Sequence, residues 1–173
     1  MNSEILVKNI LLHSYTKTHA QRCLYLFRKA LESILFAEKQ ASKEITESFL
    51  QYVKSTVAEE ERFFFLGWST SFLSSLTQEN FSKLLSETEE KLNAIMTIPV
   101  WVAYTPGQEI EKKIHVFLSQ KIKQDFFVIF NLDEDSIGGF IFEYRGEVFD
   151  YSLRKVVRDK KEEIEKIVSA YES

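Results

Sequence analysis

Three histidines and a single cysteine are among the side chains of this sequence that could act as metal ligands, acid–base groups or a nucleophile. His13, His19 and His115 are far apart, and none has a second ligand at a spacing typical of zinc sites. Cys23 lies within a helical pattern without a recognisable base, and a lone cysteine cannot form an intramolecular disulfide. We therefore interpret these four residues as surface or packing side chains.

Two adjacent segments have the composition of ligand-binding loops. Asp133, Glu134 and Asp135 could coordinate a divalent cation, but the segment lacks the interleaved ligands and glycine of an EF-hand loop. Gly138 and Gly139 could cradle a phosphate, but a strand rather than a helix start follows them. We expect a solvated turn, and glycines where another backbone approaches closely or a strand bulges. The sequence contains no catalytic constellation, and we expect no metal and no cofactor.

Composition and charge narrow the classes of function. A chain of 173 residues that is 45% hydrophobic is long enough to bury roughly 70% of its unfolded surface, in one core or two small ones. The 22 basic and 26 acidic residues are mixed along the chain, so no sustained basic field favours nucleic acid as a partner. Neither a run of about 18 apolar residues nor a targeting pattern is present. We expect a soluble cytosolic chain that reaches a membrane only through partners.

The elements that hold these residues differ between the two halves of the chain. Residues 1–97 have helical periodicity throughout, which predicts an all-α helical bundle. The predicted helices cover 18–40, 42–55 and 58–76, one more carries an apolar stripe over 5–11 and another over 81–96, and Ser42 and Thr77 are the expected N-caps. In the 58–76 helix, aromatic residues spread round most of the circumference. Phe64, Phe65 and Trp68 therefore either fill the bundle core or form a groove for an amphipathic partner helix.

From residue 98 onward the pattern changes to that of a small α/β domain, because Pro99 excludes continuation of the preceding helix. Thr105 and Pro106 are expected to open a helix, with Gln108 completing a capping box. The predicted order is a strand over 98–104, that helix, a strand over 126–130, a hairpin and a last helix over 153–171. The first two strands should be parallel, joined by a right-handed crossover. The fold class is thus α+β, with domains 1–97 and 98–173 and a mixed sheet in the second.

The hairpin has a predicted register. A turn at Arg145 and Gly146 places Phe140 opposite Tyr151, and likewise Phe142 opposite Phe149. These aromatic pairs share one face of the hairpin, since strand side chains alternate. We expect both helices of the domain to lie on that face and cover the rings.

The residues of this hairpin also resemble a known family signature. Ile137-Gly138-Gly139-Phe140, an alternating strand, a turn and Asp150-x-Ser152 before a basic amphipathic helix are similar to the delta subunit of F-type ATP synthases, whose mitochondrial counterpart is the oligomycin-sensitivity-conferring protein. The chain departs from the family pattern at Ser136, where an aliphatic residue is common. It departs again at Arg145, where members often have the turn glycine.

This resemblance implies a non-catalytic stator role in proton-coupled ATP synthesis. The N-terminal bundle would bind alpha subunits of the catalytic head, and the C-terminal domain would bind the membrane-anchored b subunits. The chain would then lie peripherally at the cytoplasmic side of the cell inner membrane. The candidate partner-binding residues are Phe64, Phe65, Trp68, Arg154, Lys155 and Arg158. The alternatives are a peripheral-stalk subunit of a V- or A-type rotary ATPase, an unrelated helical interaction adaptor, and a small soluble enzyme.

Overall fold

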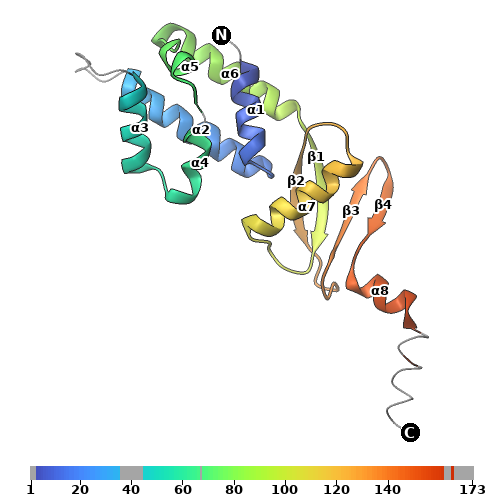
Figure 1. Cartoon of the computed structure of the whole chain (residues 1–173). Helices are drawn as coiled ribbons and strands as arrows, with labels where there is room; N and C mark the ends of the chain where they lie inside the picture. The colour runs from blue at the N-terminus through green and yellow to red at the C-terminus, as the bar shows by residue number, and fades with distance from the viewer. Residues whose placement is uncertain (1–2, 36–44, 67, 162–164, 166–173) are drawn as a thin grey trace. The chain divides into compact units, whose positions relative to one another are not determined.

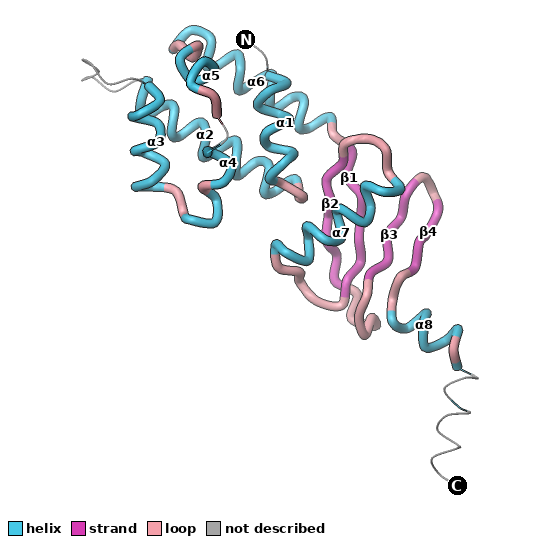
Figure 2. The backbone as a smooth tube through the Cα atoms, in the orientation of Figure 1, coloured by secondary structure: helices cyan, strands magenta, loops and turns pink. Residues whose placement is uncertain are grey.

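The computed structural model describes residues 3–35, 45–66, 68–161 and 165. The chain folds into two compact units, Met1–Met96 and Thr97–Ser173. The first unit is helical and the second contains a four-stranded sheet (Figures 1 and 2). The predicted α+β class with a mixed sheet is confirmed.

The first unit is a bundle in which α1, α2 and α6 contact one another. Its helices are α1 (Ser3–His13), α2 (Lys17–Leu35), α3 (Ile45–Thr56), a 3₁₀ turn (Glu59–Glu61), α4 (Phe63–Leu66), α5 (Thr70–Ser74) and α6 (Gln78–Ala94). The Thr77 side chain accepts a hydrogen bond from the Asn80 backbone N–H, and the Asn80 side chain accepts one in return from the Thr77 N–H. This capping box confirms Thr77 as the N-cap of α6. The expected cap Ser42 lies outside the described residues.

The single helix predicted over 58–76 is wrong. The structure instead has the 3₁₀ turn, α4 and α5 in succession. Ser69 is the N-cap of α5 in an extended conformation, and its hydroxyl accepts from the Phe72 N–H. Because the chain changes direction between these short elements, aromatic residues that would surround one long helix can face a common interior. Of the residues in the predicted pattern, the side chains of Phe63 and Leu66 lie outside the description.

The second unit consists of β1 (Met96–Val102), α7 (Gln108–Lys121), β2 (Phe126–Leu132), β3 (Phe140–Tyr144), β4 (Glu147–Asp150) and α8 (Leu153–Asp159). The strand order is β2-β1-β3-β4, and β3 is antiparallel to both of its neighbours. The Asp133 N–H donates to the Val102 carbonyl at 2.9 Å. This bond joins the carboxyl ends of β1 and β2, as expected for the parallel pair in a mixed sheet.

The predicted hairpin register is confirmed. Phe142 pairs with Phe149, and the Tyr151 N–H donates to the Phe140 carbonyl at 2.9 Å. Arg145 and Gly146 both have positive φ, at 55° and 78°, which is the conformation of a type I′ turn. This turn matches the right-handed twist of the flanking strands.

Two helix predictions in this unit are wrong. The crossover helix begins at Gln108 with Gly107 as an N-cap that has no side chain, rather than with Thr105 as its cap. Gln108 is itself the first helical residue, so it cannot complete a capping box. The Gly107 carbonyl accepts from the Glu111 N–H at 3.0 Å, so the helix starts beyond the buried Pro106 rather than on it.

Two helices were expected to pack on the aromatic face of the hairpin, and only α7 does so. Phe117 of α7 packs edge-on against Phe140 and Tyr151, with ring centroids 5.5 and 5.0 Å apart. By contrast, no residue of α8 is buried, and α8 points away from the strands of its own unit (Figure 1). Its first residue is tied to the glycine loop by a bond from the Leu153 N–H to the Gly138 carbonyl, 3.0 Å long. The helix consequently leaves from the end of the sheet, and Ile164, Ile167, Val168 and Tyr171 of the predicted stripe lie outside the described residues.

Candidate functional site

The signature residues of the hairpin converge on one backbone crossing. Gly139 has φ +76°, and a Cβ atom there would lie 2.3 Å from the Tyr151 carbonyl oxygen and 2.8 Å from the Ser152 Cα. Gly138 faces Leu153, whose Cδ1 would be 2.9 Å from an added Cβ. The glycine pair therefore lets residues 151–153 pass close to the loop that precedes β3. This confirms the expectation of a close backbone approach and gives the motif a structural role.

Asp150 and Ser152 fix the start of α8. The Asp150 carboxylate accepts from the Ser152 N–H at 2.9 Å, and the buried Ser152 hydroxyl accepts from the Lys155 N–H at 3.2 Å. Hydrogen bonds from Ser152 lower the pKa of Asp150, and the charges of Lys155 and Arg158 act in the same direction. The two signature residues thus cap the helix and set its direction.

Arg154, Lys155 and Arg158 gather beside this cap. They line a hollow of about 160 Å³ together with the carboxylates of Asp133 and Asp150. The structure thus brings the three predicted basic candidates together at one place. Arg158 also lies 3.6 Å from the Asp159 carboxylate, and Lys161 lies 3.7 Å from Glu165, which confirms one expected i,i+4 pair. Glu162, the expected partner of Arg158, is outside the described residues.

The aromatic candidates of the bundle lie in its interior. Phe64, Phe65 and Trp68 are only 2%, 1% and 9% exposed. Phe27 of α2 is at the centre of their cluster, 5.1 Å from the Trp68 ring and 6.1 Å from the Phe49 ring. Of the two readings left open by the sequence, the geometry supports core packing. The break between α4 and α5 turns these three side chains inward, whereas their part in partner binding stays a prediction.

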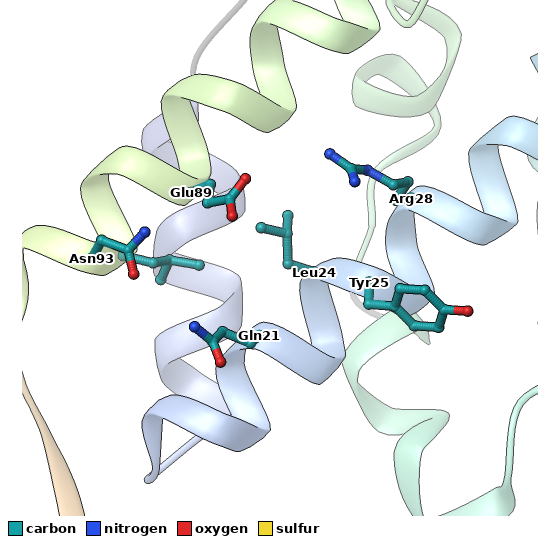
Figure 3. A pocket seen from close by; sticks show the side chains of 7 residues that line it. Gln21, Leu24, Tyr25, Arg28, Glu89 and Asn93 are labelled. Carbon is teal, nitrogen blue, oxygen red and sulfur yellow. The ribbon is translucent and has the colours of Figure 1, made fainter.

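A groove that the sequence did not reveal lies between α2 and α6 (Figure 3). Its volume is about 170 Å³, and its lining residues are Gln21, Leu24, Tyr25, Arg28, Glu89, Leu92 and Asn93. Leu24 and Leu92 are buried, whereas Tyr25 is 56% exposed and the polar side chains stand at the rim. The sequence gives only a weak signal for this groove, because Tyr25 is adjacent to the apolar stripe of α2 and has the pattern of an ordinary surface residue.

His13, His115 and Cys23 have packing partners within their own units. The His13 Nδ1 is 2.9 Å from the Asn9 carbonyl, and His115 stacks on Phe126 with its Nε2 3.3 Å from that residue's carbonyl. Burial lowers the pKa of His115 and raises the pKa of the Cys23 thiol. Among the residues that the structure describes, no cluster of histidine, cysteine and carboxylate side chains could hold a metal ion. Within the same residues, none of the helices combines the length and apolarity needed to span a bilayer.

Comparison with known families finds one match that extends across both compact units. A family model described as ATP synthase delta (OSCP) subunit matches residues 28–164, which include most of the first unit and all of the described sheet. No curated protein matches the chain. The chain belongs to the ATP synthase delta (OSCP) subunit family, whose members are structural, generally non-catalytic subunits of that membrane-associated complex.

Proposed function

We propose that this chain is the peripheral-stalk subunit that links the catalytic head of an F-type ATP synthase to its membrane-anchored b subunits. The observation that carries the proposal is the family match, which extends across both compact units. A stator must resist the torque of the rotor, so its task requires two binding surfaces and a stable fold rather than a catalytic centre. The proposed location is the cytoplasmic side of the inner membrane, and the proposed role is in proton-coupled ATP synthesis.

The helical unit would bind the alpha subunits of the head. The α2/α6 groove supports this assignment, because its leucine floor could take an apolar side chain of a partner helix and its polar rim could bind the flanks. Tyr25 is the exposed aromatic residue of the groove, and tyrosine is enriched among residues that dominate binding energy. Phe64, Phe65 and Trp68 would support head binding indirectly, by holding the helices in place.

The α/β unit would bind the b subunits. Its basic residues Arg154, Lys155 and Arg158 lie together at the start of α8, where a partner with acidic side chains could reach them. The cap made by Asp150 and Ser152 would give this surface a fixed orientation.

Affinity purification from the native membrane fraction tests the assignment. The tagged chain should recover alpha and b subunits of ATP synthase together, and recovery of neither would contradict the proposal. In a titration with the purified head, Tyr25→Ala should weaken binding by about tenfold, since truncating an aromatic hot spot costs about 1–2 kcal/mol. Lys83→Ala is the control, because Lys83 is an exposed α6 residue outside the groove. Equal affinities of both variants would exclude the groove as the head-binding site.

A further inference from the structure

The edge of the sheet at β2 lacks the features that usually protect a sheet edge. β2 is seven residues long and contains no charged residue, no proline and no glycine. At the opposite edge of the sheet, β4 has only four residues and carries Glu147 and Asp150. Long uncharged edge strands pair readily with other strands, and natural sheets commonly interrupt them with lysine, proline or a bulge. β2 is therefore the edge of this sheet that is open to pairing.

The backbone groups of β2 point alternately toward β1 and away from it. The Asp133 N–H donates to the Val102 carbonyl at the end of β1, so the backbone of every second residue before Asp133 also points toward β1. The groups that point outward belong to Phe126, Val128, Phe130 and Leu132. In agreement, the Phe126 carbonyl accepts from the His115 Nε2 at 3.3 Å. Among the described residues no strand pairs with this outer side of β2, so Val128 and Phe130 offer N–H and C=O groups for a further ladder.

The side chains of β2 also leave apolar surface at this edge. Ile129, in the middle of the strand, is 48% exposed, and Leu132 at its end is 61% exposed. His115 of α7 stacks on Phe126, so Ile129, three positions further along, lies on the sheet face opposite α7. Pairing at the outer edge of β2 would cover Ile129 with the side chain that lies opposite it.

We propose that β2 pairs antiparallel with β2 of a second copy of this chain, about a two-fold axis at Ile129. In that register Ile129 lies opposite the same residue of the second copy, Val128 lies opposite Phe130, and Phe126 lies opposite Leu132. The outward backbone groups of one copy then meet those of the other, as a closed two-fold contact requires. An axis at Val128 or Phe130 would keep this match but shorten the overlap. A second copy suits the edge because each of these pairs joins two apolar side chains.

The size of the contact sets its expected strength. Two strands of seven residues bury only a few hundred Å² per partner, below the roughly 800 Å² per partner of stable interfaces. We therefore expect a monomer–dimer equilibrium with a Kd of about 100 μM. The inference concerns the free chain and does not depend on the stator assignment.

Sedimentation equilibrium of the full chain is the first test. Between about 10 and 500 μM, the average mass of the unchanged chain should rise from that of a monomer toward that of a dimer. Ile129→Lys should weaken the dimer about tenfold or more, because two lysines would face each other at the axis. Val148→Lys is the matched control, since Val148 is an exposed apolar residue of the other edge strand, and this variant should dimerise as the unchanged chain does.

A pair of opposite charges tests the register itself. Ile129→Glu alone should weaken the dimer as Ile129→Lys does, whereas an equimolar mixture of the two variants should dimerise again. Residues directly opposite each other at Ile129 form a pair without hydrogen bonds, with Cα atoms about 4.5 Å apart, which is within the range of a disulfide. Ile129→Cys should therefore give a covalent dimer with oxidised glutathione, and Val148→Cys should not. Circular dichroism checks that each variant is folded.

Three results would overturn the proposal. They are a chain that stays monomeric over the whole concentration range, equal losses in Ile129→Lys and Val148→Lys, and a mixture of the lysine and glutamate variants that does not dimerise. If the unchanged chain is monomeric but Ile129→Lys loses binding to the purified head or to the b-subunit stalk, a strand of that partner covers β2 instead of a second copy. None of these results bears on whether the chain joins head and stalk, which the recovery of both partners tests separately.

Discussion

Single residues decide how the second unit closes, and three of the four glycines in its loops differ in what they do. Gly139 combines a positive φ with a backbone 2.3 Å from any added Cβ. Gly146 has a positive φ of 78° but no atom within 4 Å, and Gly107 has neither constraint. The motif glycine is therefore needed for space as well as conformation, whereas the turn glycine is needed for conformation alone.

Alanine substitutions at these three positions should form a graded series. Gly139→Ala should lower the free energy of unfolding by ~3 kcal/mol or more, because the carbonyl of Tyr151 must move. Gly146→Ala should cost about 1 kcal/mol from its positive φ. Gly107→Ala should be near zero, because reduced unfolded-state entropy offsets the poorer N-cap. Urea denaturation measures the three free energies of unfolding, with Trp101 fluorescence as the signal in a Trp68→Phe background. Equal losses in Gly139→Ala and Gly107→Ala would contradict the close backbone crossing at Gly139.

His115 gives the second unit a predictable response to acid. Burial against Phe126 lowers its pKa below the ordinary value of about 6.5, so the unfolded chain takes up the proton at a higher pH than the folded chain does. The free energy of unfolding should therefore fall as the pH drops below about 6.5, until the pH passes the lowered folded pKa. His115→Phe should flatten this part of the stability profile between pH 7 and 5. If the free energy of unfolding of His115→Phe depends on pH as steeply as that of the unchanged chain, other groups cause the pH dependence.

At the scale of elements, the bundle depends on aromatic residues brought together by a break in the chain. Phe27 contacts the rings of Phe49, Phe64, Trp68 and Phe72, which belong to or adjoin three different helices. Edge-to-face and offset contacts of this kind contribute about 0.5–1.5 kcal/mol per pair beyond burial. The α4–α5 break is thus part of the packing, because it allows successive aromatic residues to point to the same interior.

Trp68 tests this role of the cluster. Trp68→Ala should lower the free energy of unfolding by about 3–5 kcal/mol through the cavity it leaves, and Trp68→Phe should cost less because it retains a ring. Thermal unfolding followed by circular dichroism measures both. Head binding of Trp68→Phe should stay close to that of the unchanged chain at temperatures where the variant is folded. A stable Trp68→Ala protein that fails to bind the head would instead place Trp68 at the interface.

The sequence predicts elements well where the signal is local. The hairpin register follows from alternation and from Arg145-Gly146, and the α6 cap follows from Thr77. The errors occur where tertiary contacts decide. The Gly107 carbonyl accepts the first hydrogen bonds of α7, beyond the buried Pro106, and the Leu153 N–H bonds to the Gly138 carbonyl at the start of α8. Likewise, periodicity cannot tell an aromatic helix surface from short turns with a shared interior, so the sequence leaves two readings for Phe64, Phe65 and Trp68 and does not predict the α2/α6 groove.

At the scale of the whole molecule, the chain joins two compact units that offer different surfaces. The helical unit has a groove with a leucine floor and a polar rim. The α/β unit has the basic residues Arg154, Lys155 and Arg158 together at the start of α8. Family membership makes the chain a structural subunit of ATP synthase. The central claim is that it works there as a tie between two partners, through binding alone.

Analytical ultracentrifugation of a mixture of purified catalytic head, b-subunit stalk and this chain tests that claim most directly. The account predicts a single faster-sedimenting species that contains all three components and that does not form when the chain is left out. If the chain sediments with only one partner while the other remains separate, or if head and stalk join equally well without it, the chain is not the tie between them.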